Sequence, residues 1–139
     1  MTQTERLMWT KIVVMVSLLA TACSAETVTQ ADTPLVTRKI DDNSTTMTAL
    51  AHGTLVLSGG CLALEQIDGA LMTIVWRDGA AVWDEGLEQV TMSRFGGDDF
   101  EASVGDSIEL GGGEASSSRG FDYAVRPADD CPDLLWVTG

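Results

Sequence analysis

The sequence predicts an all-β domain, folded as a small antiparallel barrel or a strongly curled sheet, after a disordered N-terminal linker. Short apolar segments recur at intervals of roughly 8 to 12 residues, the spacing that antiparallel hairpins produce. Gly-Gly, Asp-Gly and Glu-Gly pairs separate these segments and favour tight turns. After residue 49, no window keeps an i, i+3, i+4, i+7 apolar pattern over several turns without a glycine. Helices are therefore not expected there.

Strand-like composition is found along the whole predicted domain. In chain order, the expected strands are 53–57, 61–64, 71–76, 80–83, 87–92, 104–110 and 134–137. Val104, Ile108 and Leu110 would share one face of their strand, because side chains alternate with a period of two. Asp106 is expected to close a turn rather than enter the core. The stretch 111–130 is expected to be a long loop.

The β domain is expected to extend from Ala49 to Gly139, roughly 90 residues, which is enough for one small core. A sheet of five or six strands of this size leaves unpaired edges, and curling into a barrel is an economical way to hide them. We therefore expect a closed or nearly closed barrel that resembles the OB-fold.

The N-terminus has the order of a signal peptide over residues 1–22. Arg6 and Lys11 precede an apolar run, 12–20, which ends in the small residues Thr21 and Ala22. As a helix, the segment from Ile12 to Ala22 would be about 16 Å long, against a hydrocarbon core of about 30 Å. It is too short for a permanent membrane span.

The residues before Cys23 read Leu19-Ala20-Thr21-Ala22, which resembles the lipobox of bacterial lipoproteins. The resemblance implies cleavage before Cys23 and a diacylglyceryl group on its thiol, so the membrane is a predicted partner. Ala20 departs from the pattern, which usually has Leu three positions before the cysteine. Ordinary secretion remains the alternative, because 20–22 also satisfies an A-x-A cleavage rule. The expected location is the bacterial cell envelope outside the cytoplasm, periplasmic or at the cell surface.

Residues 23–48 are expected to be the lipidated cysteine and a flexible linker. The stretch is rich in Ser, Thr, Ala and Asp, contains Pro34, and has a single apolar pair, Leu35-Val36. Such a composition does not support a packed core.

Charge excludes one class of partner. Removal of residues 1–22 takes Glu5, Arg6 and Lys11 from the 21 acidic and 8 basic side chains, which leaves 20 acidic and 6 basic side chains and a net charge of −14. Such a surface repels nucleic acid and anionic headgroups. It also favours a soluble monomer.

Three cysteines in an exported chain leave one without a partner, and lipid on Cys23 would remove the odd thiol. Cys61 and Cys131 then form a candidate disulfide, which an oxidising compartment permits. The alternative is a pair of buried free thiols.

Short motifs between Gly53 and Val137 resemble an uncharacterised group of small exported bacterial domains, often lipoproteins. The motifs are Gly53-Thr-Leu-Val, Gly60-Cys61-Leu, Val75-Trp76, Val104-Gly105-Asp106, Leu110-Gly-Gly-Gly113 and Cys131-Pro132. The resemblance implies a β domain with its two cysteines paired, and it implies no activity. Arg77 departs from the pattern, since many of these sequences have Pro there.

No catalytic residue is predicted, because the chain has one histidine, His52, and no lysine after Lys39. A small hydrolase is therefore the least favoured function. No cofactor is predicted. Two acidic clusters are weak Ca²⁺ candidates, although neither has EF-hand spacing. They are Asp98, Asp99 and Glu101, and Asp129, Asp130 and Asp133.

Aromatic side chains are the best candidates for a binding surface. Trp76 and Trp136 end apolar strands, so we expect them in the core. Trp83, Phe121 and Tyr123 border loops and are the predicted binding residues. The sequence thus favours a non-catalytic, membrane-tethered module that binds a protein or envelope component. The alternative is a small-ligand or Ca²⁺-binding domain.

Overall fold

The structure is a computed structural model, which describes residues 33–40, 47–93, 97–116 and 120–139. These residues form strands and no helix. The strands are β1 (Val36–Arg38), β2 (Ala49–Ser58), β3 (Cys61–Glu65), β4 (Leu71–Arg77), β5 (Ala81–Asp84), β6 (Gln89–Met92), β7 (Phe100–Ser103), β8 (Ser107–Ser116), β9 (Tyr123–Val125) and β10 (Leu134–Thr138). The predicted all-β class is confirmed.

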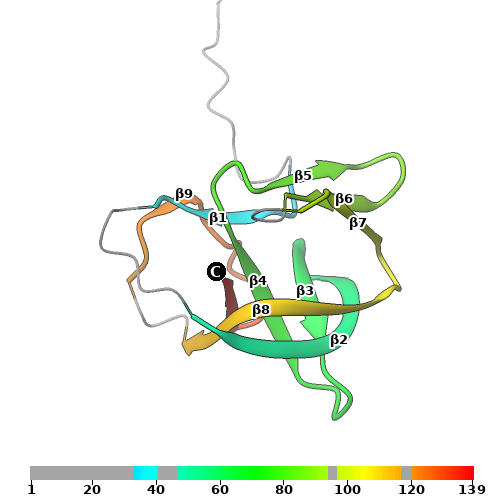
Figure 1. Cartoon of the computed structure of the whole chain (residues 1–139). Coiled ribbons are helices and arrows are strands. Elements are labelled where there is room, and N and C mark those ends of the chain that lie inside the picture. The colour runs from blue at the N-terminus through cyan, green and yellow to red at the C-terminus, as the bar shows by residue number, and fades with distance from the viewer. Residues whose placement is uncertain (1–32, 41–46, 94–96, 117–119) are drawn as a thin grey trace, which may run out of the picture.

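Five of these strands pair into a ring (Figure 1). β2 pairs with β3 and β8, β8 pairs with β10, and β3 pairs with β4, all antiparallel. A parallel pairing between β10 and β4 closes the circuit. Counted among themselves, the ring strands follow the order 1-2-3-5-4-1 with the third and fifth parallel, which is the strand order of the OB-fold. The predicted strongly curled sheet is therefore confirmed.

β4 is the central strand of the molecule, since five consecutive residues, 72–76, are buried. Met72, Ile74 and Trp76 point into one core cluster, whereas Val75 belongs to a second cluster. A strand covered on both faces needs an unbroken apolar run rather than alternation. This explains the sequence Leu-Met-Thr-Ile-Val-Trp. The buried hydroxyl of Thr73 donates a hydrogen bond to the Pro132 carbonyl at 2.7 Å.

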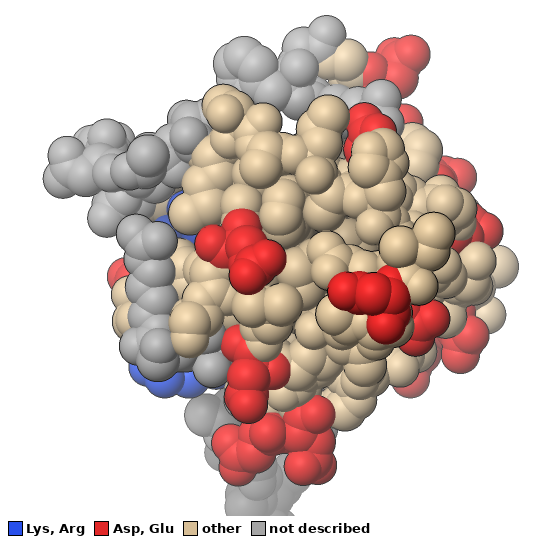
Figure 2. All heavy atoms as spheres, turned by 90° about the horizontal axis from the view of Figure 1, so that it is seen from below, with Lys and Arg blue, Asp and Glu red and all other residues tan. Residues whose placement is uncertain are grey.

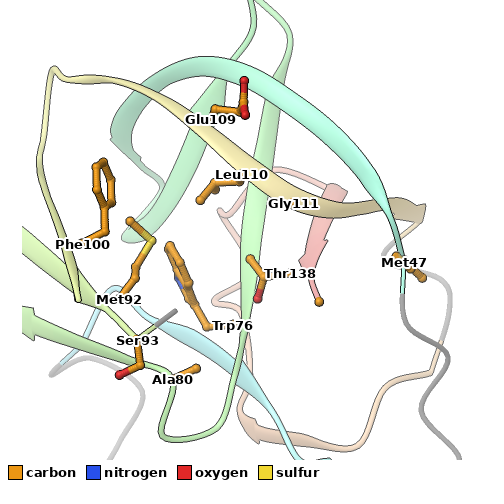
Figure 3. Close-up of a pocket in the computed structure, with 11 residues that line it drawn as sticks. Met47, Trp76, Ala80, Met92, Ser93, Phe100, Glu109, Leu110, Gly111 and Thr138 are labelled. Atoms are coloured by element: carbon orange, nitrogen blue, oxygen red, sulfur yellow. The ribbon is translucent and has the colours of Figure 1, made fainter. Parts of the chain in front are cut away.

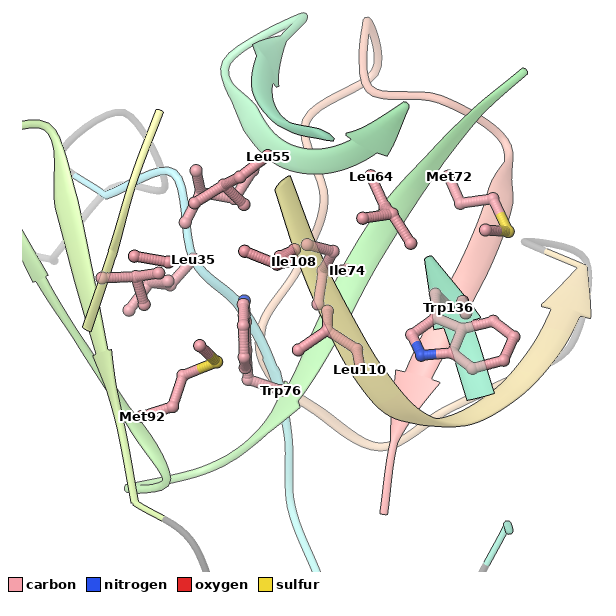
Figure 4. Close-up of a cluster of buried hydrophobic side chains, with 14 residues drawn as sticks. Leu35, Leu55, Leu64, Met72, Ile74, Trp76, Met92, Ile108, Leu110 and Trp136 are labelled. Atoms are coloured by element: carbon pink, nitrogen blue, oxygen red, sulfur yellow. The ribbon is translucent and has the colours of Figure 1, made fainter. Parts of the chain in front are cut away.

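The first core cluster combines side chains from the ring strands with side chains from the three-stranded sheet and from the segment before β1 (Figure 4). Its largest members come from β2, β3, β4 and β8, and Trp136 reaches it from β10. Trp76 and Trp136 are 2% and 5% exposed, so both predicted core tryptophans are buried. A separate three-stranded sheet, β5-β6-β7, adds Val90, Met92 and Ala102 to this cluster.

The second core cluster contains the Cys61–Cys131 disulfide, which joins the start of β3 to the segment before β10. The Cα atoms of the two cysteines are 5.7 Å apart, and 70 positions separate them in sequence. The predicted disulfide is therefore present, and the alternative of two free thiols does not hold. Val36, Val75 and Leu135 pack around it.

Two sequence-based boundaries need correction. Residues 36–38 of the predicted linker form β1, which pairs with β4 in parallel and with β9. Val36 is 1% exposed, so the pair Leu35-Val36 is core and the domain begins before residue 49. The predicted loop 111–130 begins as the second half of β8 and also contains β9. The Asp106 turn is as predicted, since its Oδ2 accepts a hydrogen bond from the Ser103 amide at 2.8 Å.

The predicted signal peptide, Cys23 and the linker residues up to 32 lie outside the described residues. The described part of the chain contains no helix that is long and apolar enough to cross a membrane.

Candidate functional site

The three predicted binding aromatics do not share one surface. Trp83 lies on β5 and packs, half-buried, against the first core cluster. Phe121 and Tyr123 are partly buried and pack against the second cluster. They are therefore separate candidates, and their surroundings differ.

Trp83 lines a cavity of about 220 Å³ formed by three segments that are distant in sequence. The end of the β2–β3 hairpin, the chain just before β1, and the β5–β6 turn meet there. The lining residues are Thr33, Pro34, Leu57, Gly60, Trp83, Glu85 and Glu88. Trp83, Pro34 and Leu57 supply apolar surface, and Leu57 is 43% exposed although it is a leucine. We call this space the Trp83 cavity.

Two carboxylates of the β5–β6 turn give the Trp83 cavity its charge. Glu85 and Glu88 are both exposed, and none of the described residues that line the cavity is basic. The turn between them is ordered by its own hydrogen bonds. Asp84 Oδ1 accepts from the Leu87 amide at 2.9 Å, and the Glu85 carbonyl accepts from the Glu88 amide at 3.3 Å.

Glu88 has an unusual backbone. Its φ is 46°, and among the described residues it is the one residue other than glycine with a positive φ. This left-handed conformation costs roughly 1 kcal/mol or more for a residue with a Cβ. The Glu88 carbonyl accepts a hydrogen bond from the Val104 amide at 2.9 Å, which ties the turn to the end of β7. The fold thus holds a glutamate where glycine would be favoured.

The surface beyond the cavity is also acidic. Figure 2 shows Asp and Glu side chains spread over the face seen from below, with Lys and Arg only towards its edge. The whole chain carries 21 acidic and 8 basic side chains. Long-range attraction therefore favours cationic partners.

Phe121 and Tyr123 are engaged with neighbours. Their rings meet edge to face with centroids 5.9 Å apart, and the Arg126 guanidinium lies 5.8 Å from the Tyr123 ring centre. Burial raises the pKa of the Tyr123 hydroxyl, and the positive charge of Arg126 opposes this shift. These contacts indicate that the two rings cover the second cluster and have a packing role.

A second cavity of about 280 Å³ lies between the ring and the three-stranded sheet (Figure 3). Met92 and Phe100 lie on the same side of Trp76, and Glu109 and Thr138 supply polar groups. The Trp76 Nε1 atom is buried without a hydrogen-bond partner, and it is sealed from solvent. A molecule in this cavity would meet polar and apolar surface in about equal measure.

The remaining residues that the sequence singled out are His52 and the six weak calcium candidates. His52 Nε2 lies 3.1 Å from Glu109 Oε2 across the β2–β8 pair, and both side chains are exposed. The six calcium candidates are in the described part of the chain. That part contains no group of three or more His, Cys, Asp or Glu side chains placed to hold a metal ion.

Trp83 was a candidate from the sequence, whereas the other residues that line its cavity were not. Thr33 and Pro34 were assigned to the linker, and Glu85 and Glu88 look like ordinary solvated charges in sequence. The one available signal was the Glu85-Gly86 turn directly after Trp83.

The comparisons with known proteins found no match. No family model matches the chain, and no curated protein or solved structure is significantly similar to it.

Proposed function

We propose that this chain is a lipid-tethered, extracytoplasmic binding module without catalytic activity, and that the Trp83 cavity is its binding site. The observation that carries the proposal is the meeting of an accessible tryptophan with two carboxylates in one cavity. Binding sites combine apolar or aromatic walls with a few polar groups that orient the ligand. The partner would be a protein or another component of the cell envelope.

The disulfide supports a location outside the cytoplasm. Structural disulfides form and persist in oxidising compartments and are rare in reducing ones. Cys61–Cys131 is mostly buried and sits in a packed cluster, so it has a structural role. An oxidising environment is also what export by the predicted signal peptide would provide.

A tether at Cys23 would hold the Trp83 cavity near the membrane. Thr33 and Pro34 line the cavity, so the chain reaches the domain at the binding site itself. Ten peptide units connect Cys23 to Thr33, and they span at most about 36 Å. The predicted linker, which ended at residue 48, would have placed the start of the domain 26 positions after Cys23. The described chain reaches the cavity only ten positions after it. The proposed partner is therefore one that approaches the membrane surface.

The side chains that line the two cavities suit binding. Neither lining includes a histidine, cysteine or lysine among the described residues. The carboxylates Glu85 and Glu88 are exposed and belong to one turn. Such groups suit the binding of positive charge better than proton transfer in a dry site.

A second candidate function is the binding of a small ligand in the second cavity, the one of about 280 Å³ that Trp76 lines. The larger volume and the side chains of Trp76, Met92 and Phe100 favour it. Substitution Phe100→Ala in this cavity and Trp83→Ala in the other would separate the two functions.

Affinity capture tests the proposed function. The mature protein, extracted from its own membrane in mild detergent, serves as bait beside the Trp83→Ala and Phe100→Ala variants. We expect a specific envelope component to be retained by the wild type and by Phe100→Ala, and lost with Trp83→Ala. Retention that does not depend on Trp83 would contradict the assignment of the site.

A further inference from the structure

We infer that the Trp83 cavity holds one lysine or arginine side chain from a basic segment of a partner protein. The inference rests on the proposed function, because it names the ligand chemistry of the same site. It is carried by the size of the cavity, its charge, and the conformation of Glu88.

The size fits one long side chain. A volume of about 220 Å³ between three short segments of the chain is open to water-sized groups. This space is on the scale of one long side chain, such as that of arginine or lysine. A folded domain or a helix does not enter such a space. A single projecting side chain does.

The walls match the two parts of such a side chain. Pro34 and Leu57 offer apolar surface to the methylene stem. The Trp83 ring offers a π face, which attracts a cation held above it. Long basic side chains bury their stems in this way while the charged head stays near water.

Charge selects the head group. Glu85 and Glu88 lie at the cavity, and none of the described lining residues is basic. A carboxylate or phosphate ligand would meet like charges, whereas a guanidinium or ammonium would meet two acceptors. The overall excess of acidic side chains acts in the same direction at longer range.

The backbone of Glu88 is the remaining argument. A side chain at a φ of 46° is destabilising, and glycine at this position would remove the strain. Strained positions that persist in a fold are concentrated at functional sites. At this position the strain is explained if the carboxylate of Glu88 is needed at the cavity.

NMR titration of the mature protein in detergent micelles tests the inference. The protein is labelled with ¹⁵N in its tryptophans, and Trp83→Phe assigns the Trp83 indole signal. The probes are short peptides that carry one arginine, one lysine or one citrulline and are otherwise uncharged. Citrulline has nearly the shape of arginine without its charge. We expect the first two to shift the Trp83 signal, and citrulline to bind at least about tenfold more weakly.

Matched variants locate the charge. Glu85→Gln and Glu88→Gln should each weaken arginine-peptide binding a few-fold, and the double variant should weaken it about tenfold. Glu101→Gln on β7 is the control, since Glu101 is exposed and lines neither cavity. It should change the affinity less than twofold. Melting temperatures equal to that of the wild type would show that the variants are folded.

Several results would overturn the inference. They are equal binding of citrulline and arginine peptides, an effect of Glu101→Gln as large as that of Glu88→Gln, or no shift of the Trp83 signal by either basic peptide. If the basic peptides fail while capture still depends on Trp83, the proposed binding site stands and only the ligand chemistry is wrong. If capture is also independent of Trp83, the proposed function fails as well.

Discussion

Gly59 and Cys131 meet where the β2–β3 turn touches the segment before β10. The Cys131 Sγ atom lies 3.5 Å from the Gly59 carbonyl oxygen, and a Cβ at position 59 would collide with the Asp130 carbonyl oxygen. Gly59 and Gly60 have φ values of 59° and 88°, as the two central residues of a type I′ hairpin turn require. The glycines and the disulfide therefore hold two loops of the domain together.

The first prediction concerns Gly59. Gly59→Ala should lower the free energy of unfolding by about 2 kcal/mol or more, because the methyl group displaces the Asp130 backbone. Gly60→Ala is the matched control, since a Cβ there has nothing within 4 Å and only the positive φ is strained. It should cost about 1 kcal/mol. Urea denaturation measures both values, and equal losses would mean that the close approach to Asp130 is unimportant.

The second prediction concerns the disulfide. The double variant Cys61→Ser/Cys131→Ser should lose about 4 kcal/mol of unfolding free energy, because a closure of 70 positions no longer restricts the unfolded chain. Denaturation of the wild type with and without reductant gives the same comparison without mutation. A midpoint that is the same in both conditions would contradict a stabilising bridge.

The third prediction is a trade-off at Glu88. Glu88→Gly should raise the free energy of unfolding by up to about 1 kcal/mol, because glycine adopts a φ of 46° without strain. The same change should weaken binding of an arginine peptide a few-fold. Glu101→Gly, in the extended strand β7, should instead destabilise by about 0.5 to 1 kcal/mol. Loss of stability in Glu88→Gly would remove the strain argument.

The fourth prediction concerns Tyr123, the one tyrosine of the chain. Burial raises its pKa above the ordinary value of 10.0, and Arg126 lowers it in part. Deprotonation is thus easier in the unfolded chain than in the folded one. The contribution is present below pH 10.0, and the free energy of unfolding falls as pH rises through that value and towards the raised pKa.

Tyrosinate absorbance near 295 nm measures this titration directly. The midpoint of the folded protein should lie above that of the urea-unfolded chain, and Arg126→Gln should move it further up. A folded midpoint at or below the unfolded one would contradict the burial of the Tyr123 hydroxyl.

Much of the fold was predictable because turns and strands leave local signals. The segments 61–64, 71–76 and 134–137 lie within β3, β4 and β10, and the Gly59-Gly60 turn closes the hairpin as expected. The strand β1 was missed because three residues carry too little periodicity to stand out in a polar stretch. Val36 pairs with Val75 of β4 and is buried in the second core cluster, whose other members lie far along the chain.

The candidate site was predictable only in part. Trp83 borders a turn and could be identified, but its cavity unites residues from 33 to 88, and no local pattern encodes their contact. Phe121 and Tyr123 have the same sequence signal as Trp83, yet they line neither cavity. The left-handed backbone of Glu88 is likewise a consequence of tertiary contacts, including the bond from Val104.

Intact mass of the membrane-extracted protein tests most directly the proposed export and lipid tether, which would present this domain outside the cytoplasm. We predict a chain that begins at Cys23, carries the added mass of the lipid, and gains two daltons when Cys61–Cys131 is reduced. A chain that still begins at Met1, or one that begins at Cys23 without added mass, would contradict the tether.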